Sequence, residues 1–266
     1  MRARGQAIAG ALLGCSIIAM DAPAYSQSVG GDRTLELGAQ VCGGVKLPFE
    51  TEPEFRARLE REGKTPSWVY AAERAMFEGG DRMSFTPRIE NGQKILMASG
   101  AIDDGAADRL RAALQSNAPI VEVWFNSPGG NSRVGTEMGE ILRSEMIATR
   151  VRKGHGCASA CSTAFIGGII RDVEPGAGYG VHMYSTQLSD DAVDYLRSSM
   201  VDKASAQSTY NTAQQRGAEG AAVRAEYVLK MGVSTKWLNV WSRTNPGCMT
   251  YMSQQELRDL FVDNSD

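Results

Sequence analysis

Between residues 93 and 185, apolar segments with the composition of β-strands alternate with segments patterned as helices, and this alternation restricts the fold more than any other feature. The strand-like runs are 94–102, 119–127 and 147–153. Helical patterns fill the intervals at 103–117 and 129–145, the first with aspartates in its first turn. Strands that alternate with helices predict an α/β fold with a largely parallel sheet.

The pattern becomes helical from residue 189 onward. Ser189 is expected to cap a helix, with two aspartates in the first turn. The apolar face of that helix is formed by Val193, Leu196, Met200 and Ala204, at spacings of three and four residues. The sequence RGAEG (216–220) is expected to interrupt it, and a second helix is expected over 221–232. The tail, 249–262, predicts a strand followed by a capped helix.

Residues 1–24 have the layout of a secretory signal peptide. Two arginines precede an apolar run over 7–20, and Ala22-Pro23-Ala24 offers a cleavage site. The run is too short to span a bilayer, which takes roughly 20 residues. A lipoprotein signal acylated at Cys15 is the second interpretation, disfavoured because the apolar run continues past that cysteine. We therefore expect a periplasmic or secreted protein with no integral membrane segment after signal removal.

The remainder divides into an N-terminal extension, 25–90, and a main domain, 91–266. Two helical patterns, 52–62 and 67–79, lie in the extension, which carries no catalytic motif. The chain is 42% apolar and 22% charged, as expected for a globular core. Its net charge of −3 argues against a nucleic-acid partner, because such a protein would present a basic surface.

Two glycine-containing turns of the main domain have the character of catalytic turns. NSPGG (126–130) follows a strand and opens a helix, so its backbone N–H groups can donate to a developing negative charge. Alone, such a turn is more often only a turn. GHGCASACSTAF (154–165) leads from a strand into a small-residue helix and presents Ser159 at the start of that helix.

A serine becomes a useful nucleophile only with a base within hydrogen-bond reach. The chain has two histidines, His155 and His182. His155 lies in the same turn as Ser159 and is poorly placed to approach it, whereas His182 lies near the end of a later strand. A glycine turn, a serine turn and a histidine at a strand end, in this order, favour a serine hydrolase site.

The run from about 94 to 262 resembles the Clp protease proteolytic subunit and its relatives, including the signal peptide peptidase A type, within the crotonase-like superfamily. NSPGG is similar to the glycine turn of that family, and Ala158-Ser159-Ala160 is similar to its nucleophile turn. Residues 171–182 resemble its arginine, proline and histidine-bearing strand, and the tail resembles its closing strand and helix. The resemblance implies a ClpP/crotonase-like spiral of repeated β-β-α units and leaves 25–90 unexplained.

Carried over to this chain, the resemblance implies Ser159 as nucleophile and His182 as general base. The backbone amides of Gly130 and Ala160 would form the oxyanion hole. The implied reaction is hydrolysis of a peptide bond in a peptide or unfolded protein, through an acyl-enzyme and without a cofactor. The helix over 193–204 corresponds to a region of subunit contacts in that family, which implies a homo-oligomer.

The sequence departs from the family at the third member of the triad. The family's aspartate stands two positions before a closing aromatic, which is Tyr251 here, and that position holds Met249. Three interpretations stay open: Asn245 or the Thr250 hydroxyl orients the imidazole, the site works as a Ser-His dyad, or the protein is an inactive relative that binds extended peptides. A crotonase-type acyl-CoA enzyme is disfavoured, because export separates it from its cofactor.

Of the five cysteines, four remain after signal removal, namely Cys42, Cys157, Cys161 and Cys248. An even number in an exported chain suggests bridges, and four cysteines allow three connectivities. On a helical first turn Cys157 and Cys161 would lie roughly 6 Å apart at Cα, within disulfide range. That bridge would leave Cys42 to pair with Cys248, and the rival interpretation is two buried free thiols. A thiol nucleophile and a metal site are both disfavoured.

Overall fold

The computed structural model describes residues 39–42, 72, 75–76, 78–184, 189–245 and 248–265, which belong to one unit, Leu35–Asp266. The predicted signal peptide, Cys15 and the predicted helix at 52–62 lie outside these residues. Of the described residues in the helix predicted at 67–79, Ala72, Ala75, Met76 and Glu78 are helical and Gly79 lies in a turn.

Five strands form the larger sheet, in the order β2-β3-β4-β5-β7. They are β2 (Ser84–Glu90), β3 (Gln93–Ser99), β4 (Glu122–Asn126), β5 (Ala148–Val151) and β7 (Arg171–Val173). β2 pairs antiparallel with β3 and the other neighbours pair parallel, so the predicted α/β class is confirmed. β2 lies before residue 91, so the last part of the predicted extension belongs to this sheet.

A second sheet has four strands in the order β1-β9-β8-β6. They are β1 (Ala39–Cys42), β9 (Cys248–Tyr251), β8 (Gly178–Val181) and β6 (Gly156–Ala158). From β5 to β8, consecutive strands alternate between the sheets, since β5 and β7 belong to the larger one and β6 and β8 to the smaller. The largely parallel sheet predicted from the sequence is the larger of the two, and the smaller sheet is additional to it.

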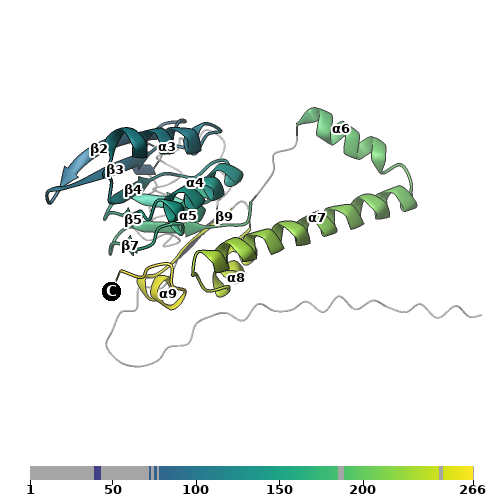
Figure 1. Cartoon of the computed structure of the whole chain (residues 1–266). Coiled ribbons are helices and arrows are strands. Elements are labelled where there is room, and N and C mark those ends of the chain that lie inside the picture. Colours follow the sequence, from purple (N-terminus) through teal and green to yellow (C-terminus); the bar gives the residue numbers. More distant parts are fainter. Residues whose placement is uncertain are drawn as a thin grey trace, which may run out of the picture. The chain divides into compact units, whose positions relative to one another are not determined.

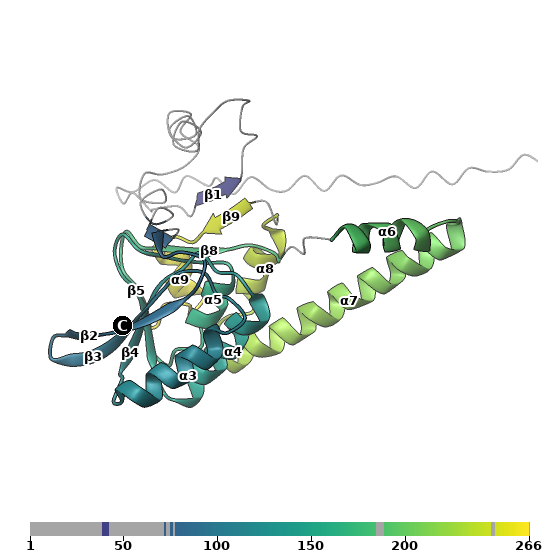
Figure 2. The same cartoon turned by 90° about the horizontal axis from the view of Figure 1, so that it is seen from above.

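The helices that follow strands of the main body are α3 (Ala106–Asn117), α4 (Ser132–Ser144) and α5 (Ala160–Phe165). α3 and α4 lie side by side (Figures 1 and 2) and bury their apolar faces in one core with β3 and β4. The Asn131 side chain caps α4 by accepting from the backbone N–H groups of Arg133 and Val134. This cap fixes the point where the glycine turn becomes a helix.

Four helices follow: α6 (Asp190–Ser199), α7 (Lys203–Lys230), α8 (Lys236–Arg243) and α9 (Gln254–Asp259). Ser189 caps α6 as predicted. The predicted interruption at 216–220 is wrong, because α7 runs through it and the helix breaks at 200–202 instead. There Asp202 forms a capping box with Ser205, which starts a new helix. α7 extends beyond the sheets, with α6 beside its first part (Figures 1 and 2).

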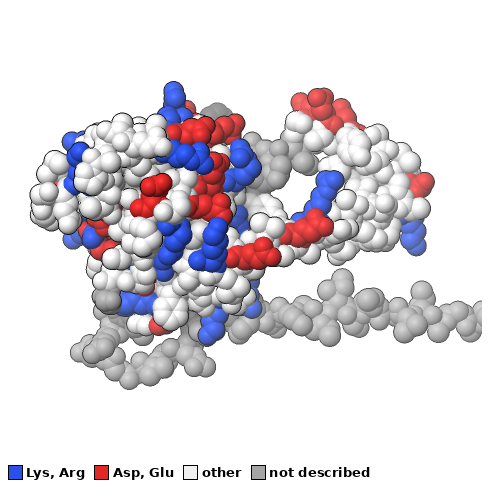
Figure 3. Space-filling model, viewed as in Figure 1, with Lys and Arg blue, Asp and Glu red and all other residues white. Residues whose placement is uncertain are grey.

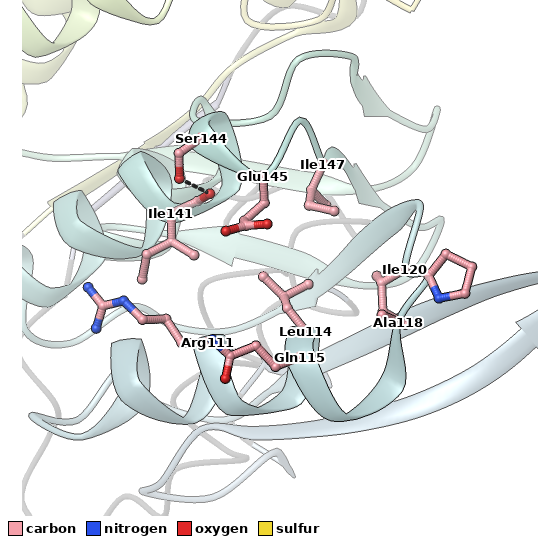
Figure 4. A pocket seen from close by; sticks show the side chains of 10 residues that line it. Arg111, Leu114, Gln115, Ala118, Ile120, Ile141, Ser144, Glu145 and Ile147 are labelled. Atoms are coloured by element: carbon pink, nitrogen blue, oxygen red, sulfur yellow. Dashed lines mark hydrogen bonds between the residues drawn. The ribbon is translucent and has the colours of Figure 1, made fainter.

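Between α3 and α4 lies a pocket of about 430 Å³, shown in Figure 4. Its lining combines apolar side chains such as Leu114 and Ile141 with the polar Arg111 and Glu145. No candidate catalytic residue lines it.

On the face shown in Figure 3, acidic and basic side chains are interspersed. None of the described helices is both long and apolar enough to cross a membrane.

Candidate active site

Ser159 occupies the turn between β6 and α5 in an unusual backbone conformation. Its φ is 58° and its ψ is −123°, a region that non-glycine residues rarely adopt and that costs about 1–3 kcal/mol. Neighbouring groups hold it there. The Ser159 N–H donates to the Gly180 carbonyl at 3.0 Å, and the Ser159 carbonyl accepts from the Ser162 N–H at 3.0 Å. The turn is therefore fixed to β8 on one side and to α5 on the other.

His182 follows β8 directly and faces the serine. β6 and β8 pair in parallel with Ala158 opposite Gly180, so Ser159 and His182 leave the same end of the two strands. His182 Nε2 lies 2.7 Å from Ser159 Oγ. A hydrogen bond of this length is what proton transfer from a serine nucleophile requires.

The glycine turn packs directly against the serine turn. Gly129 has a φ of +93°, and a Cβ placed on it would lie 2.5 Å from the Ala158 carbonyl oxygen, 2.7 Å from Ser159 Cβ and 2.8 Å from the Ala160 nitrogen. No side chain fits at these distances. Glycine at 129 is thus required by its conformation and by the approach of the two backbones.

Two backbone donors border this contact. The neighbours of Gly130 are engaged, since Ile102 N–H donates to the Gly129 carbonyl and Asn131 N–H donates to the Ile102 carbonyl, both at 2.7 Å. Within the described part of the chain, neither the Gly130 nor the Ala160 N–H donates to a protein acceptor. Two unengaged amides beside a serine are the arrangement that stabilises an oxyanion.

β9 pairs antiparallel with β8, the strand that ends directly before His182, with Gly180 opposite Tyr251 and Val181 opposite Thr250. The Thr250 hydroxyl lies 2.8 Å from the Thr244 hydroxyl. Asn245 is exposed in the segment that precedes β9. The role predicted for Asn245 or Thr250 in orienting the imidazole stays a prediction.

The serine turn is enclosed by a disulfide. Cys157 and Cys161 are bridged, with Cα atoms 5.2 Å apart, and both side chains are fully buried. Of the two interpretations from the sequence, the structure has the bridged one. Cys248 is also disulfide-bonded, and the β1–β9 register sets Cys42 opposite it. A bridged pair is consistent with an oxidising compartment.

Helix α5 is short, but side chains from other elements hold it. Buried side chains bind carbonyls of this helix: Tyr179 binds Ser162, Tyr227 binds Thr163 and Thr149 binds Phe165. The half-buried Arg143 binds the carbonyl of Ile166, which follows the helix. Burial raises the pKa of both tyrosines, so they remain neutral donors. The element that positions the serine turn is thereby held rigidly.

The sequence does not identify these supporting residues. Tyr227, for example, reaches α5 from α7, 64 residues along the chain. The local sequence places Tyr227 only in the helical pattern of 221–232. That pattern predicts that the side chain is buried, but it does not predict the hydrogen bond to α5.

The second histidine has a different environment. His155 is half-buried, and among the described residues its Nδ1 is buried without a hydrogen-bond partner. Burial, and secondarily Arg152, lowers the pKa of His155. The structure therefore brings His182, and not His155, to the serine.

No known protein-family model matches this chain. A search of curated proteins likewise finds no significant match. Among the described residues, no group of three or more histidine, cysteine, aspartate or glutamate side chains is arranged to hold a metal ion.

Proposed function

We propose that this protein is an exported serine peptidase, similar to the Clp protease proteolytic subunit and to signal peptide peptidase A, that cleaves peptide bonds through Ser159 and His182. The observation that supports it most is the 2.7 Å contact between His182 Nε2 and Ser159 Oγ, made by a serine with positive φ. The proposal includes the finer architecture, a spiral of β-β-α units. The alternation of β5, β6, β7 and β8 between two sheets supports that architecture.

The proposed reaction proceeds through an acyl-enzyme. Ser159 Oγ attacks the carbonyl carbon of the scissile bond while His182 Nε2 accepts the hydroxyl proton. The amides of Gly130 and Ala160 donate to the oxygen that becomes negative. The imidazolium then protonates the leaving amine as the carbon–nitrogen bond breaks. A water molecule, deprotonated by His182, hydrolyses the ester and restores the serine.

One observation favours a second candidate, a peptide-binding protein without activity. Met249 stands at the position where the resemblance expects a carboxylate. Loss of that carboxylate lowers the rate of such enzymes by about four orders of magnitude while leaving the geometry intact. The two candidates therefore differ in the reactivity of Ser159.

Labelling with a fluorophosphonate probe separates the two candidates. We expect mass spectrometry of the purified protein to place the phosphonyl group on Ser159, because only an activated serine displaces fluoride from the probe. Ser159→Ala should remove the label completely. Ser144→Ala, which alters a hydroxyl bound to the Ile141 carbonyl, should retain it. Absence of label on the folded wild-type protein would favour the inactive binding protein.

The proposal includes a homo-oligomer. The predicted apolar face divides between α6 and the start of α7, and α6 buries none of its residues in this chain. Tyr195, Met200 and Val201 are exposed there. We expect light scattering at micromolar concentration to give a mass above the 28.7 kDa of one chain. A monomer mass would contradict this part of the proposal.

A further inference from the structure

Arg224 of α7 connects the two segments that carry the candidate catalytic groups. Its Nη1 donates to Thr163 Oγ1 at 2.9 Å, and its Nη2 donates to Ser132 Oγ at 2.8 Å. Ser132 begins α4, two residues after Gly130, and Thr163 lies on α5, four residues after Ser159. The guanidinium therefore lies beside the site and not on the remote part of α7.

This cation has no anionic partner among the described residues. Its two hydrogen-bonded partners are neutral hydroxyls, and no carboxylate of the described chain is paired with it. Those two bonds use two of the five N–H donors of a guanidinium. Burial lowers the pKa of Arg224, as expected for a partly desolvated cation without an anion beside it. An incoming carboxylate would supply the missing charge and accept from the remaining donors.

Two aromatic side chains connect Arg224 to the segment that follows His182. The Arg224 guanidinium carbon lies 5.1 Å from the centre of the Trp241 ring. The Trp241 ring centre lies 5.5 Å from that of Tyr184, which follows His182 by two residues. Stacking on an indole fixes the plane of a guanidinium, and a fixed plane suits bidentate binding of a carboxylate.

We propose that Arg224 is a specificity-determining residue that binds a carboxylate of the peptide substrate. This inference rests on the proposed function. It names the substrate class: peptides with a carboxylate close to the scissile bond, either the C-terminal carboxylate or an aspartate or glutamate side chain. The anionic groups of an unmodified peptide are carboxylates. The described partners of Arg224 are neutral hydroxyls, so a substrate carboxylate would be its anionic partner.

The test compares matched fluorogenic peptides. One pair shares a sequence and ends in a free acid or a carboxamide, and a second pair has a carboxamide end and carries glutamate or glutamine within two residues of the scissile bond. We expect the wild-type protein to prefer the carboxylate member of at least one pair in kcat/KM by about 10- to 100-fold, the range of a charge-assisted hydrogen bond. The pair that shows the preference identifies the source of the carboxylate.

Arg224→Gln should abolish this preference by lowering kcat/KM for the carboxylate member alone. Arg224→Lys, which keeps the charge but not the planar fork, should retain part of it. The matched control is Arg216→Gln, an exposed position on the same helix, which should leave every value unchanged. A thermal melt of each variant confirms that the fold is intact.

Binding to Ser159→Ala separates failure of this inference from failure of the proposed function. Fluorescence anisotropy with the same labelled peptides should show tighter binding of the carboxylate member, and Arg224→Gln in the Ser159→Ala background should remove the difference. If the wild-type protein neither hydrolyses peptides nor takes up the fluorophosphonate, the proposed function fails. The ratio of the dissociation constants of the two members of each peptide pair still tests the inference. The inference is overturned if both members of each pair bind and are hydrolysed equally well. It is also overturned if Arg224→Gln weakens binding and turnover of both members equally, because Arg224 then has only a structural role.

Discussion

His182→Ala is expected to lower kcat/KM for peptide hydrolysis by about four orders of magnitude or more, the effect of removing the base from a serine nucleophile. The reason is geometric. His182 Nε2 is the ring nitrogen at 2.7 Å from Ser159 Oγ, so without it the hydroxyl proton has no acceptor as the nucleophile attacks. Steady-state kinetics measures the loss. The thermal midpoint should change little, because the half-buried imidazole lies at the end of β8.

The chain supplies its own control, since its second histidine lies outside this contact. His155→Gln should leave kcat/KM unchanged. Its Nδ1 has no hydrogen-bond partner among the described residues, so the substitution removes no hydrogen bond of that nitrogen. An equal loss in both variants would assign the effect to general destabilisation, and unchanged turnover in His182→Ala would remove His182 as the base.

The order of strands and helices could be predicted because periodicity is a local property. The run at 94–102 covers all of β3 except its first residue, and the runs at 119–127 and 147–153 contain β4 and β5. The division into two sheets could not be predicted, because β6 and β7 have three residues each and are too short to show alternation. Their assignment depends on hydrogen bonds to strands that are distant in sequence.

The C-terminal helices show which local signals outweigh others. Glycines at 217 and 220 suggested a break, yet α7 continues through them because alanine, glutamate and arginine around them favour helix. The decisive signal was Asp202 followed by Ser205, a capping box. Helix α8 was not predicted, although Trp237 and Trp241 recur at helical spacing and are both buried.

The candidate site was predictable only in part. Ser159 and His182 are 23 residues apart in the sequence, and their order after the glycine turn, together with the resemblance, indicated the pair. The identity of Met249 is visible in the sequence, but the pairing of its strand, β9, with β8, which leads to His182, is non-local. Arg224 had no local signature, because its two hydroxyl partners lie 61 and 92 residues away.

Gly129→Ala is expected to lower kcat/KM by at least about 100-fold, the cost of disabling one oxyanion donor. A Cβ at 129 would lie within 2.8 Å of three atoms of the serine turn, two of which are backbone atoms that cannot move aside cheaply. The turns must separate, which displaces the Gly130 and Ala160 amides from each other. Positive φ and overpacking together should lower the free energy of unfolding by about 2–4 kcal/mol, measured by denaturant titration.

Gly154→Ala is the control that separates the effect of the contact between Gly129 and the serine turn from the effect of positive φ. Gly154 also has a positive φ, +79°, but a Cβ placed on it meets no heavy atom within 4 Å. The conformational cost should be similar in the two variants, about 1 kcal/mol for an alanine at positive φ, while kcat/KM of Gly154→Ala stays at the wild-type value. The difference between the variants then measures what the close approach of the two turns contributes to catalysis. If Gly129→Ala hydrolyses peptides as fast as Gly154→Ala, the glycine turn does not contribute to the oxyanion hole.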